Sequence, residues 1–458
     1  MKKVILIFGT ASALLMSCEV AKPALDSSPI QLKSKSDEAL MTQVQKEVLK
    51  YFWEYAEPNS MLARERYHED NIYPQNDKNV ITTGGSGFGM MTILVGVDRK
   101  FIPRKEAVKK LTTMADFLAK SDRHHGAWSH WIDGETGKTV PFGKKDNGGD
   151  LVETAFLVQG IISVREYFKN GNKEEKILAQ KMDDLWKGVE WNWYTKGGEK
   201  TLYWHWSPTY GWDMNFPLKG YDETLVTYVL AASSPTYSID AETYYQGFTK
   251  NGNYTTDKSK YGLPLYVKHN GAEEYGGPLF WAQYSYLGLD PTGLADKNIA
   301  NYFDLNKNHV LIDYRYCVEN PKQWKGYGAN YWGLSAGYTR NKDGSVGYNA
   351  HTPINDFGVI NPTAALSSFP YTPKESMDFL RFLYQEKPQF IGSAGPYDAT
   401  SIHYNNWSTP RYLAIDQGTI SPMIENYRTG LIWNLFMNAP EIKKGLKKLD
   451  FKSSKYSF

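Results

Sequence analysis

Three groups of carboxylates lie next to apolar segments of the chain and could perform acid–base chemistry. The first comprises Asp146, Asp150 and Glu153. Asp150 stands at the start of a predicted helix and Glu153 follows three residues later, so the two should share one face. Clustered carboxylates cannot all ionise cheaply, so we expect the pKa of one of them to rise, as a general acid requires.

The same spacing has a structural interpretation. An Asp at a helix N-cap with a Glu three residues later is a variant of the capping box. Capping accounts for Asp150. It does not explain why Glu153 should lie in a helix that is otherwise apolar on all sides, so we weigh a functional role above capping alone.

The other two groups lie far along the chain. Asp222 and Glu223 directly precede the apolar run that begins at Leu225, where capping is again a good alternative. Asp416 precedes a glycine and a predicted helix. It could be a cap or the distant carboxylate of a catalytic pair, a role for which Asp398 competes.

Aromatic residues make up 15% of the chain, with 33 Tyr and 14 Trp. Aromatic faces stack well on sugar rings. Large cores also use aromatics, but the excess of Tyr and Trp over Phe favours an aromatic-lined groove. The predicted substrate-binding residues are Trp128, Trp131, Tyr203, Trp204, His205, Trp206, Tyr221, Trp332, Tyr427 and Arg428.

Helices must position these groups. Leu40, Val44, Val48 and Phe52 recur every four residues and predict a first amphipathic helix. Residues 150–168 are apolar almost all round, which indicates a helix buried on every side, whereas 173–190 is two-faced. Further helices are predicted near 221–233, 239–250, 295–318, 374–386, 421–437 and 440–448, with a small hairpin at 263–268. The pattern predicts a large all-α domain.

Charge and cysteine content exclude several classes of protein. The net charge is +2, and it falls to zero without Lys2 and Lys3, so the chain lacks the basic surface that nucleic-acid binding requires. No His/Cys spacing suits zinc, no acidic loop suits calcium, and we expect no metal or cofactor. Cys317 lies in an apolar stretch and is expected to be buried.

The N-terminus is typical of a bacterial lipoprotein. Residues 1–17 combine two lysines with a short apolar run and form a predicted signal peptide. Leu15-Met16-Ser17-Cys18 matches a lipobox, so Cys18 is the predicted lipidation site and 18–36 a flexible tether. We therefore expect a cell-envelope protein, facing the periplasm or exposed on the outer membrane, attached to the membrane through its lipid alone, with residues 37–458 forming one domain.

Several long motifs in a fixed order resemble the glucoamylase-like proteins of Bacteroidetes, glycoside hydrolase family 144. The segments that carry the resemblance are 84–89, 146–153, 202–208, 221–224, 277–280, 284–288, 415–418 and 425–428. The resemblance covers essentially the whole mature chain. It implies an (α/α)6 toroid, with an inner and an outer ring of helices and small hairpins in the loops, and endo-acting hydrolysis of β-1,2-glucan with inversion.

The resemblance also implies roles for the carboxylates. Glu223 matches the general acid, and Asp146, Asp150 and Glu153 match an acidic cluster. We assign the base to Asp416, with Asp398 in reserve, and expect a monomer that binds a β-glucan. Two alternatives remain open: a non-catalytic glycan-binding lipoprotein, and a polysaccharide lyase on the same toroid, which the neutral charge and the prominent carboxylates disfavour.

Overall fold

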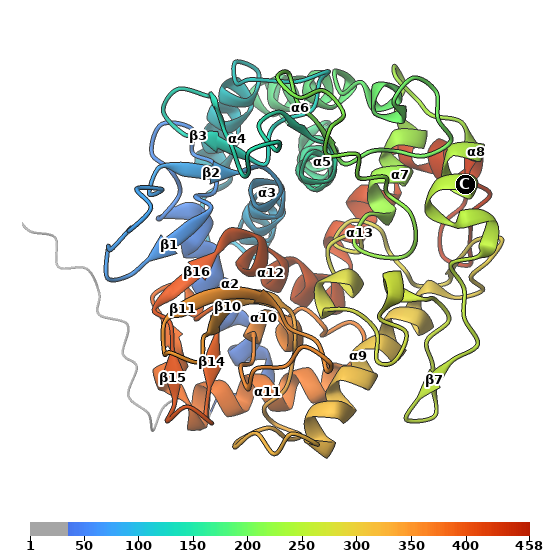
Figure 1. The fold of residues 1–458 in the computed structure, drawn as a ribbon. Coiled ribbons are helices and arrows are strands. Elements are labelled where there is room, and N and C mark those ends of the chain that lie inside the picture. Colours follow the sequence, from blue (N-terminus) through green and yellow to red (C-terminus); the bar gives the residue numbers. More distant parts are fainter. Residues whose placement is uncertain (1–34) are drawn as a thin grey trace, which may run out of the picture.

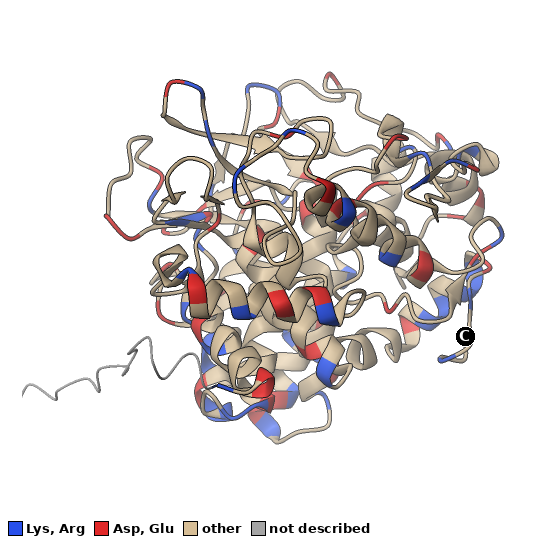
Figure 2. Ribbon diagram, turned by 90° about the horizontal axis from the view of Figure 1, so that it is seen from below, with Lys and Arg blue, Asp and Glu red and all other residues tan. Residues whose placement is uncertain are grey.

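The computed structural model describes residues 35–458. The predicted signal peptide, Cys18 and nearly all of the predicted tether lie outside the described residues. Within this range no helix is both long and apolar enough to cross a membrane. Basic and acidic residues are interspersed over the surface helices and loops (Figure 2).

Apolar helices lie at the centre of the molecule (Figure 1). Helix α3 packs between α5 and α12, α5 also contacts α7, and α12 contacts α10. Nearly every residue of α3 and α5 is buried. These inner helices are α3 (Thr83–Asp98), α5 (Leu151–Phe168), α7 (Leu225–Ser233), α10 (Pro362–Leu366) and α12 (Ala414–Arg428).

Amphipathic helices form a second layer outside the first. Helix α2 packs on α3 and α12, α6 on α5, α14 on α7 and α11 on α10, while α4 packs mainly on α6. The outer helices are α2 (Asp37–Trp53), α4 (Arg104–Leu118), α6 (Lys173–Lys187), α11 (Pro373–Glu386) and α14 (Pro440–Lys448). The remaining helices are α8 (Ala241–Thr243), α9 (Tyr302–Glu319) and α13 (Leu431–Met437).

The predicted helical class is confirmed, and the boundaries differ at identifiable places. The predicted helix 421–437 is two helices, because Gly430 adopts a left-handed conformation between α12 and α13. The predicted helix 221–233 starts only at Leu225, which leaves Asp222 and Glu223 in the preceding turn. Helix α3 was not predicted, since its first turns contain four glycines.

Those glycines explain how α3 fits between its neighbours. A Cβ atom on Gly87 would lie 2.3 Å from the Phe156 carbonyl oxygen and 2.5 Å from Leu157 Cα on α5. A Cβ on Gly85 would lie 2.8 Å from Ala414 Cβ on α12. Glycine is therefore required at these positions because the helices approach each other so closely. The glycines lower the helix propensity of α3, and the packing compensates for that loss.

Short strands pair the loops at the ends of these helices. The longest hairpin, β10–β11, was not predicted, and the hairpin predicted at 263–268 is instead the two-residue pair β7–β8. The paired strands are β1 (Arg66–His68) with β16 (Arg411–Leu413), β2 (Val80–Thr82) with β3 (Trp131–Asp133) and β4 (Thr139–Val140), β5 (Gly149–Asp150) with β6 (His205–Trp206), β7 (Ser259–Lys260) with β8 (Leu263–Pro264), β9 (Leu294–Ala295) with β17 (Lys452–Ser453), β10 (Ala336–Arg340) with β11 (Val346–Ala350), β12 (Ile391–Gly392) with β13 (Gly395–Pro396), and β14 (Thr400–Ser401) with β15 (Trp407–Ser408).

The close contact between α3 and α5 gives a first prediction. Gly87→Ala should lower the free energy of unfolding by about 2 kcal/mol or more, because its methyl group meets backbone atoms that cannot move aside. Gly96→Ala, in the same helix, is the control: its Cβ would meet the ends of the Leu49 and Ile102 side chains, which can shift. Equal effects of the two variants in urea unfolding would contradict this account.

Candidate active site

Carboxylates gather where several inner helices begin. Asp150 is the N-cap of α5, Glu153 lies in its first turn, Asp416 lies in the first turn of α12, and Glu223 stands two residues before α7. Glu153 Oε2 accepts a hydrogen bond of 2.7 Å from the Gly84 amide in the first turn of α3. The partial positive charge of helix N-termini favours carboxylates at this end of the bundle.

Asp150 is the most firmly held of these acids. Its Oδ1 accepts hydrogen bonds from the Val152 and Glu153 amides at 3.0 and 2.9 Å. Its Oδ2 lies 3.1 Å from His130 Nδ1 and 3.5 Å from His205 Nε2. Burial alone would raise the pKa of Asp150, but the two histidines hold it well below its usual value. The predicted cap is therefore confirmed, and the same residue is also a buried carboxylate anion.

The two histidines take up the opposite charge. Strand β5 pairs with β6 so that Asp150 lies directly opposite His205, whose Nε2 is also 3.3 Å from Asp146 Oδ2. Burial opposes protonation, but Glu153 and Asp150 raise the pKa of His130 to about 10. Hydrogen bonds to Asp146 and Asp150 likewise raise the pKa of His205 to about 9. Both imidazoles are therefore cations at neutral pH.

This charge state also bears on metal binding. Ligand atoms of His130, Asp146 and Asp150 lie within 4.8 Å of one another, a spacing that could hold a metal ion. A metal ion needs neutral imidazole ligands, so it would have to displace protons that these residues hold tightly. The arrangement is better suited to a network of ion pairs.

Glu153 and Glu223 have the opposite character to Asp150. Burial and the charge of Asp150 raise the pKa of Glu153 to about 7, although His130 opposes this. Burial raises the pKa of Glu223 well above its usual value, with contributions from Asp222 and Glu153. Glu223 is partly exposed, and no other side chain between residues 35 and 458 hydrogen-bonds its carboxyl group. The raised pKa of Glu223 favours the protonated form, and its carboxyl group is not held by another described side chain.

The neighbouring Asp222 plays a different part. Its carboxylate accepts hydrogen bonds from the Thr224 amide and hydroxyl at 3.0 and 2.6 Å, and from Asn270 Nδ2 at 2.7 Å. These bonds fix the turn before α7. The Ser285 hydroxyl donates to the Glu223 backbone carbonyl at 2.5 Å and holds the turn from the other side.

Asp398 and Asp416 form a second acidic pair. Both are almost fully buried, at 4% and 2% exposure. Asp398 Oδ2 accepts from the Tyr338 amide at 2.6 Å, and Asp416 Oδ1 accepts from the Tyr284 hydroxyl at 3.1 Å. The remaining oxygen of each finds no donor among the described residues. A proton shared between the two carboxyls would satisfy both oxygens.

The pKa values of the pair agree with a shared proton. Burial raises the pKa of Asp398 to about 6, and burial together with the charge of Asp398 raises the pKa of Asp416 well above its usual value. The pair therefore titrates as one unit that keeps a proton and a single negative charge near neutral pH.

An aromatic cavity of about 420 Å³ lies beside the histidine–aspartate network. Its floor includes His130, Asp146 and His205. Trp204 lines it together with Phe142 and Phe216, which are 52% and 50% exposed. Trp131 stands next to it, edge-on to Phe142 with ring centroids 4.8 Å apart. Exposed aromatic faces beside carboxylates are what a sugar-binding site requires.

Several residues predicted to bind substrate lie elsewhere. Trp128, Tyr221 and Trp332 are fully buried core residues without a free face. Tyr203 is buried, and its hydroxyl bonds Glu199 at 2.6 Å. Trp206 packs against His125 and Trp193. Loop position in the sequence did not reveal which aromatics fill the interior.

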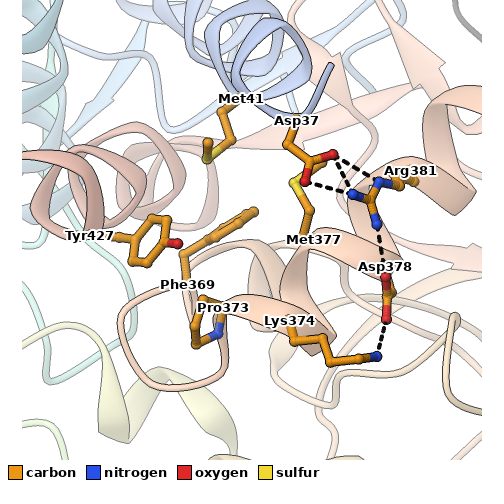
Figure 3. A pocket seen from close by; sticks show the side chains of 9 residues that line it. All are labelled: Asp37, Met41, Phe369, Pro373, Lys374, Met377, Asp378, Arg381 and Tyr427. Carbon is orange, nitrogen blue, oxygen red and sulfur yellow. Dashed lines mark hydrogen bonds and ion pairs between the residues drawn. The ribbon is translucent and has the colours of Figure 1, made fainter. Parts of the chain in front are cut away.

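The prediction also assigned Tyr427 and Arg428 to the substrate site, but the structure places them elsewhere. They end α12, about 16 Å along the helix from Asp416. Arg428 bonds Thr42 and Gln45 on α2. Tyr427 lines a separate pocket of about 330 Å³, next to Phe369 and Met41 and near the Asp37–Arg381 ion pair (Figure 3). Neither residue reaches the carboxylates.

Other residues of the site were missed. His130, Phe142 and Phe216 stand in loops without a motif of their own. Tyr284 lies within a segment that carries the family resemblance, and this was the one available signal. The contacts of these residues form only when distant loops meet, so local spacing could not reveal them.

Comparison with known proteins identifies the family of this chain. The family model Glycoamylase, described as "Putative glucoamylase", matches residues 215–440. A structure from Bacteroides caccae described in the same words is 53% identical, with a TM-score of 0.89, covering 92% of this chain and 100% of that one. An endo-β-1,2-glucanase from Chitinophaga pinensis, solved with sophorotriose and glucose, is 52% identical with the same coverage and a TM-score of 0.89.

A curated relative from Parabacteroides distasonis is longer. It is an exo-β-1,2-glucooligosaccharide sophorohydrolase acting at the non-reducing end, 45% identical over 434 residues. The match covers 90% of this chain and 58% of the relative, so the chain spans about three fifths of that protein's length.

The chain therefore belongs to the glucoamylase-like family of glycoside hydrolases. Two of these relatives bear the names of enzymes that act on β-1,2-linked glucose chains.

The histidine–aspartate network predicts a pH-dependent stability. The pKa of His130 is higher in the folded chain than its ordinary value of about 6.5. Its stabilisation is therefore complete below pH 6.5 and is lost as the pH rises through about 10. His130→Gln should lower the free energy of unfolding by about 1–3 kcal/mol at pH 6, and the gap to the wild type should shrink towards pH 10.

Unfolding in urea at several pH values measures that gap. His403→Gln is the control, because His403 is exposed and lies outside the network. A gap for His130→Gln that stays constant from pH 6 to pH 10 would disprove the ion-pair assignment.

Proposed function

We propose that this protein is an inverting endo-β-1,2-glucanase whose inner and outer helices close into an (α/α)6 toroid. The observation that carries the chemistry is the contrast between Glu223, a partly exposed carboxyl group with a raised pKa, and the separate, buried acidic pair of Asp398 and Asp416. Hydrolysis with inversion needs one carboxyl that donates a proton and one carboxylate that activates water.

Similarity favours an endo mode of action. The chain matches the whole length of the Chitinophaga endo-glucanase at 52% identity, and only 58% of the Parabacteroides exo-acting enzyme at 45%. An endo enzyme cuts within the polymer and yields a mixture of short oligosaccharides, whereas an exo enzyme of the second kind releases a single disaccharide. Resolving the products formed from a linear β-1,2-glucan over time distinguishes the two modes.

The residues divide the reaction between them. Glu223 donates its proton to the glycosidic oxygen as the bond to the anomeric carbon breaks. Asp416, within its pair with Asp398, takes a proton from the water that attacks the opposite face of the ring. Burial raises the pKa of Glu223, and Asp150, fixed as an anion by His130, adds to that effect. Glu153 holds the sugar and water.

The alternative functions account for less of the structure. A glycan-binding lipoprotein needs stacking faces and hydrogen bonds, and it gains nothing from a carboxyl whose pKa is raised beside a charged neighbour. A lyase needs a cationic group that neutralises a uronate. His130 and His205 are cations, but both are already paired with aspartates.

The acid assignment predicts the effect of one substitution. Glu223→Gln keeps the shape and removes the proton, so kcat on β-1,2-glucan should fall by about 100-fold or more while oligosaccharide binding persists. Glu242→Gln is the control, because Glu242 is an exposed residue of α8 outside the acidic cluster. Turnover of Glu223→Gln at wild-type rates would sink the mechanism, and Glu153 would become the next candidate acid.

The base assignment can be tested within the acidic pair. Asp416→Asn should reduce kcat by about 100-fold or more, and Asp398→Asn should reduce it less and shift the acidic limb of the pH profile near pH 6. The anomeric form of the first product, followed by NMR, tests inversion. A larger loss in Asp398→Asn than in Asp416→Asn would transfer the base role to Asp398.

We also propose that Cys18 carries a lipid that attaches the monomeric enzyme to the cell envelope. The support is the lipobox Leu15–Cys18 behind a basic and apolar leader. Cys18→Ala should move the protein from the membrane fraction to the soluble fraction of the envelope. Unchanged fractionation would refute the anchor without affecting the proposed activity.

A further inference from the structure

The hairpin β10–β11 packs directly against Asp398 of the acidic pair. The Tyr338 amide on β10 donates to Asp398 Oδ2 at 2.6 Å. A Cβ atom on the preceding Gly337 would lie 2.8 Å from the same carboxylate oxygen and 2.4 Å from Asn361 Nδ2. Only glycine allows the strand to lie this close, so the hairpin is built against Asp398.

Several contacts fix the inner strand of the hairpin. The Tyr338 hydroxyl lies 3.1 Å from His68 Nε2, and the Arg411 guanidinium stands 5.9 Å from the Tyr338 ring. Arg340, at the end of the strand, stacks 4.6 Å from the Tyr404 ring. Strand β10 is almost entirely buried, whereas β11 alternates between exposed and half-buried residues. The hairpin thus has an anchored strand and an open one.

Tyr348 is the aromatic residue of the open strand. It pairs directly with Tyr338, so the two side chains share one face of the hairpin. Yet Tyr338 is 6% exposed and Tyr348 is 60% exposed. An exposed aromatic on a rigid strand, beside a residue that holds Asp398, has no packing role to explain it.

Electrostatics indicate where the Tyr348 hydroxyl lies. Loss of surrounding water and the nearby carboxylates of Asp416 and Asp398 raise the pKa of Tyr348 well above its usual value, and Glu65 and Glu153 add to the effect. Tyr348 in turn contributes to the raised pKa of Tyr284, the residue that donates to Asp416. Tyr348 thus combines a largely exposed side chain with nearby carboxylates, and it lies directly across the hairpin from the residue whose amide binds Asp398.

We propose that Tyr348 is a positioning residue for the substrate, whose ring holds a glucosyl unit over the Asp398–Asp416 pair. The hairpin β10–β11 then forms one wall of the substrate-binding cleft. The inference rests on the proposed glucan hydrolysis, which supplies the sugar that the ring contacts. Stacking on the axial C–H groups of the sugar would stabilise the bound substrate and the transition state to the same extent.

Steady-state kinetics of the full chain on a β-1,2-linked glucooligosaccharide test this role. Tyr348→Ala should raise KM about tenfold and change kcat by less than about threefold. Tyr348→Phe keeps the ring and should restore a KM close to that of the wild type. Tyr237→Ala is the matched control: Tyr237 is 38% exposed and follows the opposite end of α7 from Glu223.

The outcomes separate this inference from the proposed function. A wild type that hydrolyses the oligosaccharide, with a KM for Tyr348→Ala equal to that of Tyr237→Ala, overturns the inference alone. A wild type without turnover sinks the proposed function, and fluorescence titration with the same oligosaccharide then decides about Tyr348. Binding that weakens only in Tyr348→Ala supports the positioning role, and equal or absent binding overturns it.

Discussion

The contact between α3 and α5 is the constraint on which the active site depends. Glycines at 84 and 87 bring the two helices so close that a methyl group would overlap atoms of Glu153 or the α5 backbone. Because the helices start at the same level, the Gly84 amide reaches the Glu153 carboxylate. Wider spacing would leave this carboxylate without its donor, and the acids on α5 and α12 would no longer share one low-dielectric environment.

Within that environment, neighbours decide which acid is charged. Asp150 is fully buried and Glu223 is partly buried, and burial raises the pKa of any carboxyl group. The pKa of Asp150 is nevertheless low, because two cationic histidines and two backbone amides stabilise its anion. The Glu223 side chain has no such partner among the described residues, and the negative charges of its neighbours raise its pKa further. The same end of the helix bundle therefore lowers the pKa of one carboxyl group and raises that of another.

The sequence predicts the helical class and much of the acidic cluster, because both depend on local pattern. Periodicity revealed α5 and α6, and an acid before an apolar run revealed Asp150 and Glu223. Helix α3 was not predicted, since its glycines disfavour a helix locally. Their presence is explained only by the close packing of the neighbouring helices. The aromatic predictions mix cavity and core residues for a related reason. Trp128 and Trp204 look alike in the sequence, and only the packing of distant loops makes the first a core residue and the second part of the cavity wall.

Capping and catalysis are not competing explanations for Asp150. Its Oδ1 satisfies the first amides of α5, and its Oδ2 faces His130 and His205. The cap fixes the carboxylate in one orientation, and that fixed orientation allows the second oxygen to order a charged network beside the cavity. The same economy appears at Asp398, where one oxygen holds the β10 amide and the other faces Asp416. In both residues, a hydrogen bond to the backbone fixes the orientation of the carboxyl group and therefore the direction of its second oxygen. The precision of the site thus depends on the helix ends and strands that support it.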